Sequence, residues 1–221
     1  MSPNELLIEH MVGSGVLHSP RIIEAFRHVD RKLFVPREVE DRAYSDEPLP
    51  LGYGVTISQP STVAYMLELL EPQPSNVILD IGSGSGWQTT LLAHIVSHDS
   101  FGKPLPKEKV GTVIGLERIP ELAQKSREAI HRFSFIQKGI VEIHTLSGER
   151  GFPSRAPYDR IICAAALDVM PEIWKKELQS EGKIVFPRQY SIILLEKGEN
   201  GEYQEKENKG YIFVPFIKDE A

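Results

Sequence analysis

The sequence contains a single cysteine, no long apolar run and no excess of positive charge. Cys163 has no second cysteine with which to form a disulfide in the chain, so we expect a reducing compartment. No stretch approaches the roughly 18 apolar residues of a membrane-spanning helix, and Met1–Glu5 lacks the basic start of a signal peptide. We therefore expect a cytoplasmic protein with no membrane partner.

Acidic side chains outnumber basic ones, with 31 Asp and Glu against 25 Lys and Arg and a formal net charge of -6. The basic residues are scattered along the chain, so a polyphosphate would be repelled and nucleic acid is not an expected partner. A chain of 221 residues buries roughly 70% of its unfolded surface without disulfides or metals. We expect one domain, residues 1–221, and a monomer.

Short apolar runs of β type alternate with segments of helical spacing in the middle of the chain. Several runs are apolar on both sides, which is typical of strands covered by helices on both faces of a sheet. The alternation predicts an α/β fold with a doubly wound, mostly parallel sheet. The expected strands are Val77–Ile81, Thr112–Glu117, Val141–Thr145, Arg160–Ala164 and Lys183–Phe186, and the expected helices are Gly86–Val96, Pro120–Phe133 and Val169–Leu178.

The two ends of the chain depart from this alternation. Residues 1–75 are poor in strands and predict a helical cap with a proline-rich loop at Asp46–Pro50, placed before a sheet core at residues 76–221. The expected cap helices are Glu5–Val12, Pro20–Val29 and Thr62–Leu70. After Pro187, two strand-like runs at Ile192–Glu196 and Tyr211–Phe216 flank a polar turn at Gly198–Gly201 and predict a C-terminal β-hairpin.

A glycine-rich loop follows the first expected strand, with the spacing Asp80-x-Gly82-x-Gly84-x-Gly86. Glycines at the end of a strand let the backbone turn sharply and approach a ligand; the alternative is a tight strand-to-helix turn without a ligand. The spacing fits neither the dinucleotide fingerprint nor the P-loop nor the nucleophile elbow. The loop resembles the first motif of class I S-adenosylmethionine-dependent methyltransferases.

The second expected strand ends at an acidic residue, Glu117. A carboxylate at this position can accept hydrogen bonds from both hydroxyls of a ribose, as the acid of a dinucleotide-binding fold does. The alternative is a solvated glutamate at a strand end. The excursion Ser97–Lys109 accounts for a separation from the glycine loop that is longer than usual.

The segment Ala43–Pro60 reads A-Y-S-D-E-P-L-P-L-G-Y-G-V-T-I-S-Q-P and follows the tripeptide at residues 34–36, Phe-Val-Pro. This segment closely resembles the signature of the protein-L-isoaspartate (D-aspartate) O-methyltransferase family. The resemblance continues at Ala156–Ile162 and Phe213–Phe216 and spans nearly the whole chain. It implies S-adenosylmethionine as methyl donor, S-adenosylhomocysteine as product, and damaged proteins bearing L-isoaspartyl or D-aspartyl residues as substrates.

The resemblance also implies roles for individual residues. The active-site serine falls on Ser58, which would also contact the substrate together with Val214. The alternative for Ser58, a cap of the helix starting near Pro60, is compatible with that role. The implied cofactor-binding residues are Thr56, Ile57, Gln59, Ser61, Asp80, Gly82, Ser83, Gly84, Gly86, Leu116, Glu117, Gly148 and Glu149.

The sequence departs from the family pattern at two places. Ser147-Gly148-Glu149 stands where family members usually carry Gly-Asp-Gly, whose aspartate bonds the adenine amino group. Either Glu149 takes over from one position further on, or adenine recognition is weakened. At residues 187–189 the chain has Pro-Arg-Gln in place of Pro-Val-Gly, which bears on substrate specificity.

Methyl transfer to a carboxylate needs no general base, because a carboxylic acid of pKa about 4 is ionised at neutral pH. The lack of a convincing His or Cys nucleophile agrees with this chemistry. His94 and His98 lie four residues apart, but the zincin glutamate and a third ligand are missing, so we expect no metal.

Two other functions remain open at this point. One is a related methyltransferase that esterifies an aspartate in a dedicated peptide, and the other is a non-catalytic module that keeps the fold and the cofactor. The Ser147-Gly148-Glu149 departure favours the module, and the intact Thr56-Ile57-Ser58 segment argues against it.

Overall fold

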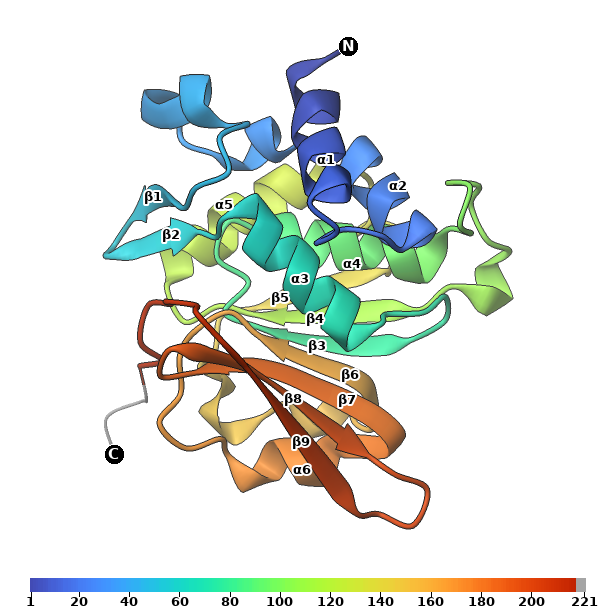
Figure 1. The fold of residues 1–221 in the computed structure, drawn as a ribbon. Helices are drawn as coiled ribbons and strands as arrows, with labels where there is room; N and C mark the ends of the chain where they lie inside the picture. The colour runs from blue at the N-terminus through green and yellow to red at the C-terminus, as the bar shows by residue number, and fades with distance from the viewer. Residues whose placement is uncertain (218–221) are drawn as a thin grey trace.

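A seven-stranded sheet in the order β5-β4-β3-β6-β7-β8-β9 runs through the molecule in the computed structural model, which describes residues 1–217 (Figure 1). The strands from β5 to β7 in that order are parallel, and β8 and β9 are antiparallel to their neighbours. This confirms the predicted α/β class with a mostly parallel sheet. The strands are β3 Val77–Ile81, β4 Thr112–Leu116, β5 Val141–His144, β6 Tyr158–Cys163, β7 Leu178–Arg188, β8 Ser191–Lys197 and β9 Tyr203–Lys209.

Helices cover both faces of the sheet (Figure 1), with α1 to α5 on one face and α6 on the other. Alternate strand residues face the two sides: Ile78 and Val113 join the core beneath α3, α4 and α5, whereas Leu79 and Ile114 join the core around Trp174 of α6. The helices are α1 Pro3–Gly13, α2 Pro20–His28, α3 Pro60–Leu70, α4 Trp87–Ser97, α5 Pro120–His131 and α6 Glu172–Glu177, with 3₁₀ turns η1 Arg31–Phe34, η2 Arg37–Arg42, η3 Lys107–Lys109, η4 Gly148–Arg150 and η5 Pro153–Arg155.

The N-terminal cap contains the three predicted helices, and it also contains strands that the sequence did not predict. β1 Leu49–Gly52 and β2 Val55–Ile57 form a separate antiparallel pair, so the predicted loop at Asp46–Pro50 runs directly into a strand. Leu49 and Ile57 pair and are both buried. The pairing is short and turns at Gly52 and Gly54, where φ is positive, so no period-two pattern was long enough to reveal it.

The C-terminal hairpin exists, but its second strand was predicted in the wrong place. β8 pairs with β9 at Tyr203–Lys209, whereas Tyr211–Phe216 forms no named strand. β9 is an exposed edge strand rich in Glu and Lys, as edge strands often are, so it lacks an apolar signature. The apolar side chains of Tyr211 and Phe216 pack instead on Tyr65 and Trp174.

Two boundaries also move. The predicted helix Val169–Leu178 is reduced to the six residues of α6, because Pro171 precedes its first turn. β7 begins at Leu178 and is longer than the predicted Lys183–Phe186. Within residues 1–217, no helix has both the length and the apolar character that a membrane crossing requires.

Candidate active site

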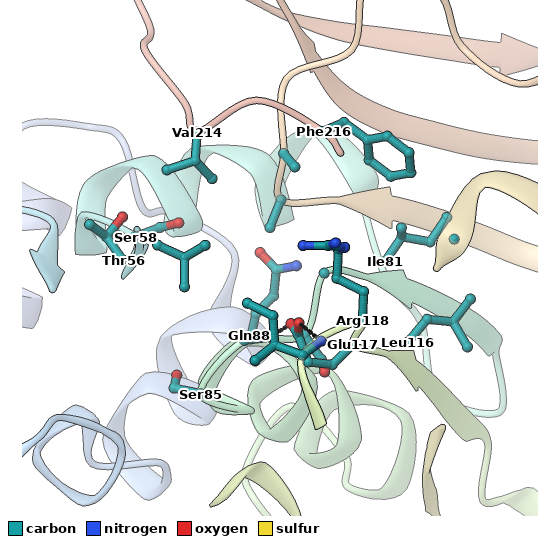
Figure 2. Close-up of a pocket in the computed structure, with 18 of the residues that line it drawn as sticks. Thr56, Ser58, Ile81, Ser85, Gln88, Leu116, Glu117, Arg118, Val214 and Phe216 are labelled. Carbon is teal, nitrogen blue, oxygen red and sulfur yellow. Dashed lines mark hydrogen bonds between the residues drawn. The ribbon is translucent and has the colours of Figure 1, made fainter. Parts of the chain in front are cut away.

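A pocket opens at the carboxyl ends of β3, β4 and β6, where parallel α/β sheets bind their ligands (Figure 2). The glycine loop and the end of β4 form its floor, the segment after β2 forms one wall, and the C-terminal segment at residues 214–217 lies across it. Of the predicted site residues, those that line the pocket are Thr56, Ile57, Ser58, Gly82, Ser83, Gly84, Leu116, Glu117, Gly148 and Val214.

The glycine loop is held tightly against the end of β4. The amides of Gly82 and Ser83 both donate to the carbonyl of Leu116, at 2.8 and 3.0 Å. Gly82 has a φ of 78°, and a Cβ added there would approach no atom closer than 4.0 Å. The backbone conformation, and not a lack of space, therefore restricts this position to glycine.

Gly86 and Asp80 support the loop from behind and do not line the pocket. A Cβ on Gly86 would lie 2.5 Å from the Ser126 hydroxyl oxygen of α5. The fully buried Asp80 carboxyl accepts hydrogen bonds from the Gln88 amide at 2.8 Å and from the Thr89 hydroxyl at 2.6 Å. Burial raises the pKa of Asp80 to about 6. Both residues thus orient the first turn of α4 beneath the loop.

Glu117 lies at the centre of the pocket floor (Figure 2) and is only 5% exposed. Its carboxylate accepts the amide of Gly84 through Oε2 and the amide of Ile119 through Oε1, both at 2.9 Å. It is therefore not the solvated strand end that was the alternative. Each carboxylate oxygen can accept a second hydrogen bond, so Glu117 can bind a hydroxyl-bearing ligand while it holds the loop.

Ser58 and Thr56 face the pocket from the wall opposite the glycine loop (Figure 2). Among residues 1–217, no hydrogen bond engages the Ser58 hydroxyl, and the predicted helix cap is supplied by another residue. The Asp46 carboxylate accepts the Ser61 amide at 2.8 Å and the Gln59 side-chain amide at 3.2 Å. The Gln59 side chain and the Ser61 backbone therefore bond to Asp46, and neither residue lines the pocket.

The far end of the pocket carries the Ser147-Gly148-Glu149 departure. Ser147 and Gly148 line the pocket, and Glu149 does not. Gly148 packs on Ile81 so closely that a Cβ would lie 2.2 Å from the Ile81 side chain, and its carbonyl accepts the indole N–H of Trp174 at 2.8 Å. Ser147, one position before the glycine, is thus the polar residue of the departure that lines the pocket, and its hydroxyl also accepts the amide of Glu149 at 3.3 Å.

Val214 lies across the pocket from the glycine loop, near Ser58 in Figure 2. Its carbonyl accepts the amide of Ala166 at 2.8 Å, and the amide of Phe216 donates to the Ala166 carbonyl at the same distance. These two bonds fasten the C-terminal segment beside the end of β6 and form part of the pocket wall from Val214 to Ile217.

Sequence reasoning missed several residues that line the pocket. Within the described part of the chain, residues 1–217, Arg118 is the only lysine or arginine that lines the pocket, and its adjacency to Glu117 was the available signal. Gln88 belongs to the first turn of α4 after the glycine loop. Tyr53 and Phe216 lie in the two segments that resemble the family, Ala43–Pro60 and Phe213–Phe216, but nothing in the sequence marked their side chains as pocket residues. These last two reach the pocket only because the chain folds back over it.

The two histidines considered as metal ligands lie outside this pocket. The rings of His94 and His98 stack with centroids 4.1 Å apart, and His28 stacks on the other side of His94 at 4.8 Å. The described residues 1–217 contain no cluster of three or more His, Cys, Asp or Glu with the geometry of a metal site.

Comparison of the sequence with known proteins identifies a family and several relatives. A sequence model described as "Protein-L-isoaspartate(D-aspartate) O-methyltransferase (PCMT)" matches residues 1–221. A protein-L-isoaspartate O-methyltransferase of Methanopyrus kandleri is 38% identical over 221 residues, covering 98% of this chain and 92% of the relative. One from Aeropyrum pernix is 39% identical over 215 residues, covering 96% and 78%.

The fold is shared with a Plasmodium falciparum protein described as a beta-aspartate methyltransferase (PCMT) and crystallised in complex with S-adenosyl-L-homocysteine. The two align with a TM-score of 0.84 over 99% of this chain and 100% of that one, at 24% identity, which is evidence for the fold alone. The evidence for common descent is the match of the family over the full length and the identity to the archaeal relatives. This chain belongs to the protein-L-isoaspartate (D-aspartate) O-methyltransferase family.

Proposed function

We propose that this protein transfers the methyl group of S-adenosylmethionine to the α-carboxylate of L-isoaspartyl or D-aspartyl residues in damaged proteins. The backbone amide nitrogen of the following residue then attacks the ester carbonyl, methanol leaves, and a succinimide forms. Hydrolysis of the succinimide partly restores the normal linkage. One observation carries the proposal beyond family membership: the Thr56-Ile57-Ser58 segment faces the glycine loop and Glu117 across a single pocket. This arrangement supports a methyl donor bound along the glycine loop and a methyl acceptor bound beside Ser58.

The pocket residues fit the cofactor. The positive φ at Gly82 leaves the loop backbone open to a ligand, and Glu117 retains acceptor capacity for ribose hydroxyls. We assign cofactor contacts to the predicted residues that line the pocket: Thr56, Ile57, Gly82, Ser83, Gly84, Leu116, Glu117 and Gly148. Asp80, Gly86, Gln59 and Ser61 act from behind as supports, and we assign the adenine end to Ser147 and not to Glu149.

When bound, S-adenosylmethionine supplies an activated methyl group on a sulfonium. The acceptor carboxylate is already ionised at neutral pH, so the chain has no proton to remove. The residues act by position, which can contribute up to roughly 7 to 11 kcal/mol in a well-oriented site. The free hydroxyl of Ser58 orients the carboxylate, and Val214 holds the substrate chain beside it.

The direct test pairs two peptides that differ only in an isoaspartyl or a normal aspartyl residue. With labelled S-adenosylmethionine, we expect base-labile methyl ester on the isoaspartyl peptide alone. Several unrelated isoaspartyl sequences should be accepted. Methylation confined to one sequence would indicate a dedicated substrate, and binding of S-adenosylhomocysteine without any ester would indicate a non-catalytic module.

We also propose a single domain that acts as a monomer in the cytoplasm. Helices α1 to α3 share one hydrophobic core with α4, α5 and the sheet, which supports a single cooperative unit. The lone Cys163 is buried, in keeping with a reducing compartment. Sedimentation of the purified protein tests the oligomeric state, and a single transition in urea tests the domain count.

A further inference from the structure

Arg31 carries a fully buried guanidinium in the cap, outside the pocket. It begins the 3₁₀ turn η1, and its relative exposure is 0%. Buried arginines are rarely stable without partners, and among residues 1–217 no carboxylate is in hydrogen-bond contact with this one. Its partners are backbone carbonyls: Ala43 at 2.8 Å, Ser45 at 3.3 Å, Glu47 at 2.9 Å and Ser58 at 3.1 Å.

These four carbonyls come from both ends of one segment. Ala43, Ser45 and Glu47 precede the β1–β2 pair, and Ser58 follows it. The guanidinium therefore draws the two legs of the hairpin together at one point. A planar guanidinium carries its N–H donors on nitrogens that lie apart, so Nη1 can reach Ala43 and Ser45 while Nη2 reaches Glu47 and Ser58. The three donors of a lysine ammonium all lie on one atom and cannot span these positions.

The same side chain is also placed against the cofactor side of the site. The guanidinium carbon lies 5.4 Å from the ring centroid of Trp87, the residue that follows Gly86 and lines the pocket. The indole N–H of Trp87 is held by the Val29 carbonyl at 3.2 Å. Arg31 therefore contacts both the β1–β2 hairpin and the first residue of α4, and it fixes the position of one relative to the other. Burial lowers the pKa of Arg31 to about 10, so it stays charged at neutral pH.

We infer that Arg31 is a positioning residue for methyl transfer: it fixes the backbone of Ser58, and with it the Ser58 hydroxyl, relative to the cofactor loop. The inference rests on the proposed role of Ser58. Arg31 does not line the pocket, so it acts through the Ser58 carbonyl and not on the reactants.

The test uses R31K, which keeps the charge and most of the stem but loses the fork. The matched control is R160K. Arg160 is a half-buried arginine that is also bonded to carbonyls, those of Leu70 and Asp159 at 2.8 Å, and it does not line the pocket. We expect both variants to lose thermal stability. Well below either unfolding midpoint, R31K should lower kcat on an isoaspartyl peptide at least tenfold, and R160K should stay within twofold of wild type.

A double-mutant cycle separates positioning from a general structural role. If Arg31 acts through Ser58, R31K should lower kcat by less than twofold in the S58A background, and the dissociation constant of S-adenosylhomocysteine should change less than threefold in R31K. Two outcomes would overturn the inference about Arg31 and leave the proposed function intact. One is an equal loss of kcat in R31K and R160K, and the other is losses of kcat in R31K and S58A that multiply in the double mutant. Wild-type kcat in S58A would remove the proposed role of Ser58 as well. If R31K does not fold, R31Q is compared in the same way, because it removes the buried charge.

Discussion

Glu117 does two things with one carboxylate. Its oxygens hold the amides of Gly84 and Ile119, and they face the space in which we place the ribose. Glu117→Ala removes up to two charge-assisted hydrogen bonds to a ligand, each worth roughly 1.5 to 3 kcal/mol. We expect S-adenosylhomocysteine to bind at least tenfold more weakly, as measured by calorimetry.

The control for this prediction is Glu149→Ala. Glu149 does not line the pocket, so its removal should change the dissociation constant less than twofold. The assignment would be contradicted if Glu149→Ala greatly weakened S-adenosylhomocysteine binding while Glu117→Ala left it unchanged. Glu149 would then be the residue that recognises the adenine or the ribose.

The Ser58 hydroxyl faces the pocket and does not cap α3, because the Asp46 carboxylate accepts the amide at the start of that helix. Ser58→Ala should therefore lower kcat by about tenfold, equivalent to one hydrogen bond of roughly 1.4 kcal/mol, with little loss of S-adenosylhomocysteine affinity. The profile of rate against pH between 5 and 8 should keep its shape, because the nucleophile is the substrate's own carboxylate. A variant with wild-type kcat, or one that no longer binds the product, would contradict the orienting role.

The loop between β3 and α4 shows how two glycines of one motif serve different neighbours. Gly82 faces the pocket with open space around it, whereas Gly86 packs against Ser126 of α5. Gly82→Val should abolish S-adenosylhomocysteine binding in a folded protein, because a β-branched residue is strained at a φ of 78° and its side chain enters the ligand space. Calorimetry and circular dichroism check the two halves of this prediction.

Whereas Gly82→Val is expected to abolish ligand binding, Gly86→Ala, in the same loop, is expected to lower the stability of the fold. Its Cβ would lie 2.5 Å from the Ser126 hydroxyl oxygen, so α4 and α5 must move apart. We expect a loss of roughly 1 to 3 kcal/mol in the free energy of unfolding, measured in urea. If Gly86→Ala retains full stability, or if Gly82→Val binds with wild-type affinity, the division between ligand space and helix packing is wrong.

At the scale of the whole molecule, His94 makes stability depend on pH. It is 4% exposed, and its Nε2 has no partner among residues 1–217. Burial, and then the charges of His98 and His28, lower the pKa of His94 to about 3. An unfolded histidine titrates near 6.5, so the unfolded chain binds more protons below that pH. The contribution of the neutral, buried His94 to the free energy of unfolding is fully present above pH 6.5, and it is lost as the pH falls toward 3.

Between pH 6.5 and 5 this linkage amounts to about 2 kcal/mol for His94. Asp80 acts in the opposite sense, because its raised pKa favours the folded state as the pH falls below about 6. The comparison must therefore be made between variants. Between pH 7.5 and 5, the free energy of unfolding measured in urea should fall by about 2 kcal/mol less in His94→Leu than in wild type. Equal losses in the two proteins would mean that His94 is not buried neutral.

The sequence alone determined the parallel sheet, the glycine loop, the acid at the end of β4, the family and the T-I-S segment. These features depend on local spacing: apolar runs of period two or 3.6, and glycines and carboxylates at strand ends. Strands β3 to β5 differ from their predicted ranges by at most one residue at either end, because buried strands flanked by helices leave a continuous apolar signal.

Only the tertiary structure decided which side chains share the pocket. Asp80 and Gln59 fit the motif equally well, yet their side-chain hydrogen bonds turn them away from the pocket. Arg118 was not among the predicted site residues, yet it lines the pocket. Nor does any local pattern place Arg31 within reach of the Ser58 carbonyl, 27 residues further along the chain. Such contacts arise when distant segments pack together, and local periodicity records only which face of an element is buried, not which partner covers it.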